Sequence, residues 1–137
     1  MTQTPILFET KHQILFSDLD PYKHMRSDNY ASYFVNHRML GLRKYLGWDQ
    51  KALETAPFMV WMRRIEIDFK RPVWGDCEVV INSYVLDFNG PDAFIECTMT
   101  DGGSVVFAKC LMIVAHVDKE KMSACDWPED RKALFFQ

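Results

Sequence analysis

Apolar and aromatic side chains recur at helical spacing in the first third of the chain. They lie three or four positions apart over about eighteen residues, enough for a helix of roughly 27 Å, at Tyr30, Tyr33, Phe34, His37, Leu40 and Tyr45. This spacing predicts a helix with one buried face, and it places His37 in the core. Ser27 and Asp28 are N-cap candidates, because their side-chain oxygens can accept from free N–H groups of a first turn. Gly47 suits the C-terminal end.

A glycine lies inside this predicted helix. Gly41 costs about 1 kcal/mol relative to alanine in a helix interior. We therefore expect another backbone to approach the helix closely there.

A period of two predicts strands on both sides of the helix. Residues 8–17 before it form one predicted strand, and Ile65, Ile67 and Phe69 alternate with charged residues after it, as expected for a strand with one buried face. Three more strands follow: one to about Phe88, one over 93–100 after the turn signal "NGPD", and one over 104–117 after "DGG". The last is almost wholly apolar, which predicts a place inside the sheet. "DWPED" predicts a final helix with Pro128 as its first residue.

This order of elements predicts an α+β domain. An antiparallel five-stranded sheet would curl around one long central helix, because that packing buries both apolar faces. The 137 residues suffice for a single domain, 1–137, with a hydrophobic core. A curled single sheet leaves an edge open, which favours pairing with a second copy.

Composition and charge narrow the functional classes. Apolar residues make up 48% and charged residues 26%, which excludes intrinsic disorder, and a net charge of −3 gives no general attraction to nucleic acid or anionic membrane. The first residues lack the pattern of a signal peptide, and no apolar run is long enough to cross a bilayer, so we expect a cytoplasmic protein. The four cysteines and four histidines show neither CxxC nor HExxH spacing, which argues against a metal site and favours reduced thiols over disulfides.

The stretch "SDLDPYKHMRSDNY", residues 17–30, contains the candidate chemistry. On the residues alone, Asp18 and Asp20 most simply end the strand and order the turn before Pro21. The same position also places a carboxylate beside the positive end of a helix, an arrangement that suits catalysis.

Two motifs resemble a known enzyme family. The strand, "D-x-D-P", a short loop and "N-Y" opening a long helix that runs to Arg38 resemble the hotdog-fold acyl-CoA thioesterases of the 4-hydroxybenzoyl-CoA thioesterase type. "IDFKRPVWGDCEVVINSYV" resembles the family's "F-x-x-P-x-x-x-G-D", and "DWPED" falls where members often have a Pro-Glu helix. The resemblance covers nearly the whole chain. It implies the hotdog fold, hydrolysis of an acyl thioester of coenzyme A or an acyl carrier protein to free acid and thiol, no cofactor beyond the substrate's coenzyme A, and a homodimer or homotetramer with its active site at the subunit boundary.

The resemblance also assigns roles to residues. Asp20 matches the catalytic carboxylate, as nucleophile forming an anhydride or as general base for water. The backbone N–H groups at the helix start would polarise the thioester carbonyl, and they belong to Ser27, Asp28 and Asn29. Tyr22, His24 and Tyr30 would bind substrate or order the site. Many relatives read "G-H-V-N-N" where this chain has Lys23-His24-Met25-Arg26-Ser27: the histidine is retained, but the glycine and the asparagine pair are not.

Two further groups of residues are candidates for substrate binding. The basic residues Arg63, Arg64, Lys70 and Arg71 could bind the phosphates of coenzyme A, but half of them alternate with Glu66 and Asp68, which equally suits a solvated face of ion pairs. Apolar side chains that would suit an acyl pocket, although such residues more often form core or interface, are Met59, Trp61, Met62 and Trp74.

Two other functions remain as alternatives. One is a hotdog enoyl-CoA hydratase, whose "D-x-N-P-x-H" is approached by "DLDPYKH"; here aspartate replaces asparagine, and Asp18 to His24 is one residue too long. The other is a non-catalytic acyl-binding module that shares the fold without the chemistry.

Overall fold

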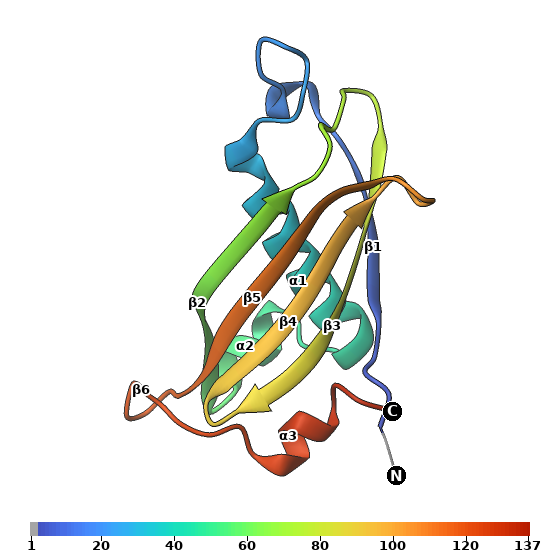
Figure 1. Cartoon of the computed structure of the whole chain (residues 1–137). Helices are drawn as coiled ribbons and strands as arrows, with labels where there is room; N and C mark the ends of the chain where they lie inside the picture. The colour runs from blue at the N-terminus through green and yellow to red at the C-terminus, as the bar shows by residue number, and fades with distance from the viewer. Residues whose placement is uncertain (1–2) are drawn as a thin grey trace.

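One antiparallel sheet curls around one long helix in the computed structural model, which describes residues 3–137 (Figure 1). The strands are β1 (Phe8–Gln13), β2 (Phe58–Phe69), β3 (Glu78–Asn89), β4 (Asp92–Thr100) and β5 (Val106–Asp118), with the short β6 (Ser123–Ala124) beside β5. The helices are α1 (Tyr30–Leu46), α2 (Gln50–Thr55) and α3 (Glu129–Ala133), and two 3-10 turns are η1 (Phe16–Asp18) and η2 (Ser27–Asn29). This arrangement confirms the predicted fold class.

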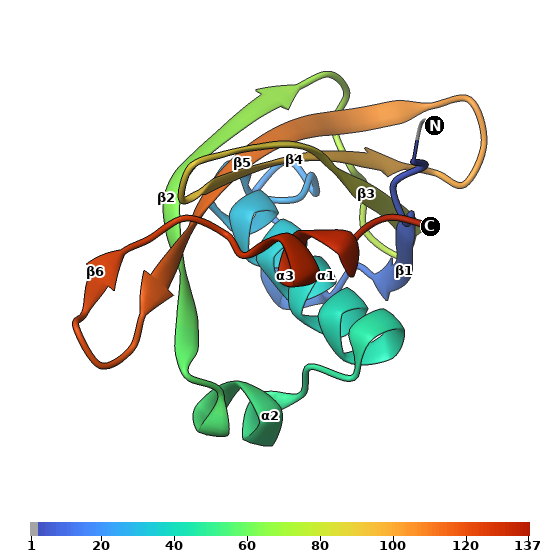
Figure 2. The same ribbon diagram turned by 90° about the horizontal axis from the view of Figure 1, so that it is seen from below.

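The sheet order β1-β3-β4-β5-β2 places β5 between β4 and β2, in agreement with its apolar sequence. All neighbouring strands are antiparallel. The predicted "NGPD" turn joins β3 to β4 through Gly90, whose φ of 61° is readily adopted by glycine. Viewed from below, β1 and β2 lie on opposite sides of α1, and α3 crosses one end of the curled sheet (Figure 2).

The buried face of α1 explains how helix and sheet hold together. Tyr30, Phe34, His37 and Gly41 are buried at the predicted spacing and face the core. Gly47 ends the helix with a φ of 71°, its N–H donating to the carbonyl of Arg43, as expected of a C-terminal glycine.

Several details differ from the sequence-based predictions. Ser27 and Asp28 do not cap α1; they form η2, and the N-cap residue is Asn29, which makes no side-chain cap hydrogen bond. Leu40 and Phe69 were expected to be buried but are 44% and 53% exposed. Pro128 is the N-cap of α3 rather than its first residue.

Three further features of the structure differ from the sequence-based predictions. Helix α2 was not foreseen, and β2 begins already at Phe58. Arg38, a charged residue, lies buried beside the apolar face of α1. Periodicity alone does not report the start of β2 or the burial of Arg38, because both depend on contacts between distant parts of the chain.

Gly41 is where the first strand meets the helix. A Cβ atom built on it would overlap the ring of Phe8 from β1, so the close approach was predicted correctly but its partner is a side chain rather than a backbone. We expect Gly41→Ala to lower the free energy of unfolding by about 1 kcal/mol, since overpacking costs roughly 1–3 kcal/mol and the gain in helix propensity offsets about 1. Urea unfolding would measure the change. A more stable Gly41→Ala protein would contradict this account.

The described part of the chain contains neither a candidate membrane-spanning helix nor a candidate metal site. Residues 3–137 contain no helix long and apolar enough to cross a lipid bilayer, and no group of three or more side chains arranged to hold a metal ion. The four cysteines are free thiols.

Candidate active site

The stretch that contains both acids folds into a narrow hairpin. The N–H of Arg26 donates to the carbonyl of Asp18 (2.7 Å), and the N–H of Asp20 donates to the carbonyl of His24 (2.8 Å). The N–H of Lys23 closes the tip by donating to the carbonyl of Asp20 (3.0 Å). The N–H of Met25 donates to the carbonyl of Val73 (2.7 Å), which fastens the hairpin to the segment between β2 and β3.

Asp20 uses one carboxylate oxygen within this hairpin and leaves the other free. Its Oδ1 accepts from the backbone N–H of Tyr22 (2.8 Å) and of His24 (3.1 Å). Its Oδ2 has no hydrogen-bond partner among residues 3–137. The carboxylate is therefore oriented by the backbone while one oxygen can meet another molecule.

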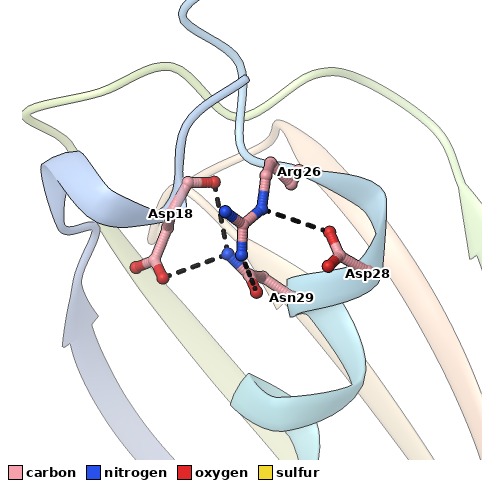
Figure 3. Close-up of polar contacts among 4 residues, drawn as sticks. All are labelled: Asp18, Arg26, Asp28 and Asn29. Carbon is pink, nitrogen blue, oxygen red and sulfur yellow. Dashed lines mark hydrogen bonds and ion pairs between the residues drawn. The ribbon is translucent and has the colours of Figure 1, made fainter.

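Asp18, in contrast, is fully occupied. Its Oδ1 accepts from Asn29 Nδ2 (3.1 Å), and its Oδ2 accepts from the N–H of Leu15 (3.2 Å) and from the hydroxyl of Tyr33 (Figure 3 shows the contact with Asn29). Burial, followed by the hydrogen bond to Asp18, raises the pKa of Tyr33 to about 12. This set of bonds identifies Asp18 as a residue that ties η1 to the start of the helix.

The start of the helix offers two free backbone donors. The N–H of Asn29 donates to the carbonyl of Arg26 (3.0 Å), so it is not available for a substrate carbonyl. No acceptor for the N–H groups of Ser27 and Asp28 lies within the described residues. Of the three predicted oxyanion donors, Ser27 and Asp28 therefore keep this capacity.

The side chain of Asp28 is turned toward a positive charge. Its Oδ1 lies 3.3 Å from Nε of Arg26, whose Nη2 also donates to Oδ1 of Asn29 (3.2 Å; Figure 3). Pairing with Arg26 reduces the repulsion that this carboxylate would otherwise exert on negative charge near the helix start.

Two of the three predicted site-ordering residues point inward. Tyr30 is buried, and its pKa is raised by burial first and in smaller part by the charge of Asp20. The ring of His24 packs edge-on against Trp74 with centroids 4.2 Å apart, and its Nε2 is buried without a partner in residues 3–137. Tyr22 is 77% exposed at the hairpin tip.

The four basic residues divide into two pairs. Arg63 binds Asp92 (Nη1–Oδ1 2.8 Å) and Arg64 binds Glu66 at the surface, as in a solvated ion-pair face. The side chains of Lys70 and Arg71 form no ion pair within the described residues, and their backbone N–H groups both donate to the carbonyl of Phe107. Only this second pair leaves its charge open to a phosphate.

An apolar cavity of about 400 Å³ lies between α1 and the sheet. Met59, Trp61 and Met62 are in its wall, whereas Trp74 packs on His24 instead. Arg38, Trp127 and Phe135 also line the cavity, the last two from the segments on either side of α3, and no local sequence pattern indicated these contacts.

Comparison with known proteins places the chain in a family. The profile of the thioesterase-like superfamily matches residues 14–135, which is most of the chain. The chain belongs to the thioesterase-like superfamily. No curated protein shows significant sequence similarity to it.

Solved structures of thioesterases share the fold of this superfamily member. The probable thioesterase YbaW from Escherichia coli superposes with a TM-score of 0.84 at 17% identity, covering 95% of this chain and 99% of YbaW. The 1,4-dihydroxy-2-naphthoyl-CoA thioesterase Slr0204 from Synechocystis gives 0.82 at 12% identity over 94% and 95%. A Thermus thermophilus thioesterase complexed with coenzyme A and Zn gives 0.77 at 21% over 93% and 90%. The hotdog fold and the family resemblance are thus confirmed, and membership supports thioester hydrolysis as the general reaction.

Lys23 occupies a position of the hairpin where glycine would suit the backbone. Its φ is 65°, in the left-handed region, which costs a residue with a Cβ atom about 1–2 kcal/mol. We expect Lys23→Gly to raise the free energy of unfolding by about 0.5–1 kcal/mol, because glycine removes this strain but loses more chain entropy on folding. Lys23→Ala is the matched control: it removes the same charge and keeps the strain, so its stability should stay near wild type in urea unfolding. Equal stabilisation by both substitutions would assign the effect to charge instead.

Proposed function

We propose that this superfamily member hydrolyses acyl thioesters with Asp20 as the reactive carboxylate. The observation that carries the proposal is the unequal use of its two oxygens: two backbone N–H groups hold Oδ1, while Oδ2 has no partner among residues 3–137. Ser27 and Asp28 would supply N–H groups to the thioester carbonyl. Each such donor is worth about 3–4 kcal/mol of barrier in enzymes where one has been removed.

Two chemical routes start from this carboxylate. As a general base, Asp20 takes a proton from water while the water oxygen bonds to the carbonyl carbon; the C–S bond then breaks, and the thiolate recovers the proton from Asp20. As a nucleophile, Oδ2 bonds to the carbonyl carbon and expels the thiolate, and water then cleaves the mixed anhydride. Both routes consume one water and yield one acid and one thiol.

Coenzyme A is the carrier that we propose first. The chain shares its fold with a Thermus thermophilus thioesterase complexed with coenzyme A. Lys70 and Arg71 are the predicted phosphate contacts whose side chains are not engaged in ion pairs within residues 3–137. We propose further that two copies pair, because β1 and β2 are the edges of the sheet and β2 exposes Trp61 and Met62.

Thiol release from a panel of aliphatic and aromatic acyl-CoAs tests the proposal. Enzyme without substrate is the blank, since the free cysteines of the protein also react with thiol reagents. Release of one thiol per acid formed would support it. Failure to cleave both the acyl-CoAs and acyl-carrier-protein thioesters would refute it, and hydration of an enoyl-CoA with its thioester intact would indicate the hydratase instead.

A further inference from the structure

The core of the domain contains a positive charge that has no negative partner among the residues the structure describes. Arg38 on α1 is 7% exposed. Its Nη1 donates to Oγ of Ser83 on β3 (2.9 Å), and its guanidinium carbon lies 4.4 Å from the ring centre of Phe8 on β1. Among residues 3–137 it forms no ion pair with a carboxylate.

This arrangement is costly for the fold. Burial lowers the pKa of Arg38 to about 10, so the group stays charged at neutral pH. An uncompensated charge removed from water costs several kcal/mol, and one hydroxyl and one aromatic face replace only part of its hydration. A guanidinium has five N–H donors. Among residues 3–137, the guanidinium of Arg38 makes one hydrogen bond, so most of these donors have no acceptor.

Arg38 is also one of the residues that line the apolar cavity. The cavity volume of about 400 Å³ falls within the range of small-molecule sites, roughly 300–1,000 Å³. Trp127 also belongs to this wall, and its indole Nε1 is buried without a hydrogen-bond partner in residues 3–137. The other wall residues are apolar, so the polar groups are few and concentrated.

Arg38 and the exposed residues of the cavity wall lie on different sides of the domain. Its contacts are with β1 and β3, whereas the exposed wall residues Trp61 and Met62 are on β2, at the opposite edge of the sheet (Figure 2). Val35 and Met39 on α1 are also partly exposed and belong to the wall. A chain that enters between α1 and β2 would therefore meet apolar surface first and Arg38 last.

We propose that this cavity binds an apolar chain whose inner end is a carboxylate, held by the guanidinium of Arg38. The planar fork of arginine matches the two oxygens of a carboxylate, and bonds of this kind are stronger in a dry environment than in water. The carboxylate can come from two sources: the far end of the acyl group of a dicarboxylic mono-thioester, or a free fatty acid. The first source rests on the proposed hydrolase function, whereas binding itself does not.

Binding is tested with decanoate and decanol, which share a chain and differ in charge. Titration of the wild-type protein is followed by tryptophan fluorescence, since Trp48, Trp61 and Trp127 are in the cavity wall. We expect decanoate to bind at least tenfold more tightly than decanol, the value of a hydrogen bond to a charged group being about 1.5–3 kcal/mol. Equal affinity for the two would overturn the proposal without any variant.

Two variants locate the effect. Arg38→Met keeps the length of the side chain without its charge and should abolish the preference for decanoate. Arg43→Met, on the same helix but outside this cavity, should leave it intact. Loss of the preference for decanoate in both variants, or in neither, would overturn the assignment. If Arg38→Met does not fold, Arg38→Lys serves in its place and should retain a weakened preference.

Hydrolysis of decanedioyl-CoA and decanoyl-CoA identifies the source of the carboxylate. A higher kcat/KM for decanedioyl-CoA that disappears in Arg38→Met would identify the acyl group's far end. No such difference, with Arg38-dependent binding of decanoate, would identify a free acid. If neither thioester is cleaved but decanoate binding holds, the cavity assignment stands and the hydrolase proposal fails.

Discussion

Asp20→Asn is expected to lower kcat for thioester hydrolysis at least a hundredfold and to leave the melting temperature near that of wild type. A hundredfold loss corresponds to about 3 kcal/mol of barrier. Asparagine keeps the Oδ1 that accepts from the N–H groups of Tyr22 and His24, so the hairpin should retain its shape. It replaces the free Oδ2 by an amide nitrogen, which neither takes a proton nor attacks a carbonyl. Parallel measurements of kcat and thermal unfolding separate the two effects.

Asp18→Asn provides the matched comparison, because the same chemical change falls two residues away. Both oxygens of Asp18 accept hydrogen bonds, from Asn29, Leu15 and Tyr33. Loss of such bonds to a charged group costs about 1–3 kcal/mol, so we expect lower stability with a smaller loss of kcat in the folded fraction. A reversed pattern, in which Asp20→Asn remains active and Asp18→Asn is folded but inactive, would move the reactive carboxylate to Asp18.

Features set by local pattern could be predicted from the sequence. The spacing from Tyr30 to Gly41 gave the long helix and placed His37 in the core, because a helix returns to the same face every three or four residues. The apolar run of β5 and the turn at Gly90 were equally local signals. These elements, in their order along the chain, are sufficient to predict an α+β domain with a sheet curled around one long helix, and the family resemblance identifies this packing as the hotdog fold.

Features that depend on distant contacts could not be predicted. Ser27 and Asp28 suit an N-cap, but the hairpin before them is fastened by the bond from Met25 to Val73, and the helix begins only at Tyr30. Arg38 is buried because β1 and β3 bring Phe8 and Ser83 against it, partners thirty and forty-five positions away. The cavity likewise exists only after helix and sheet have packed.

The different use of the two acids is the clearest case at the candidate site. "D-x-D" alone does not show which carboxylate is occupied, because both lie on one side of an extended segment. The hairpin determines which carboxylate is occupied. Asp18 lies beside the start of the helix, where hydrogen bonds engage both of its oxygens, whereas Asp20 lies near the hairpin tip and has one oxygen without a partner in residues 3–137. The family resemblance had indicated the same residue on different grounds.

His37 should make the protein lose stability in mild acid. Its ring lies between Oγ1 of Thr10 (Nδ1, 2.7 Å) and Oγ of Ser83 (Nε2, 2.6 Å) and is fully buried. Burial first, then the positive charges of Arg38 and His12, lower its pKa from 6.5 to about 3. Between these pH values His37 binds a proton in the unfolded chain but not in the folded chain. The free energy of unfolding is therefore highest above pH 6.5, as far as His37 is concerned, and decreases as the pH falls toward 3.

Urea unfolding at pH 7 and pH 5 would measure this loss. For a pKa of 6.5 unfolded and about 3 folded, one histidine accounts for about 2 kcal/mol of destabilisation between the two pH values. Other groups also titrate there, so the relevant quantity is the difference from His37→Gln, whose amide can still bond to both hydroxyls but takes no proton. We expect the variant to lose about 2 kcal/mol less than wild type over this interval. Parallel losses in the two proteins would mean that the folded chain protonates His37 as readily as the unfolded chain does, and would contradict the lowered pKa.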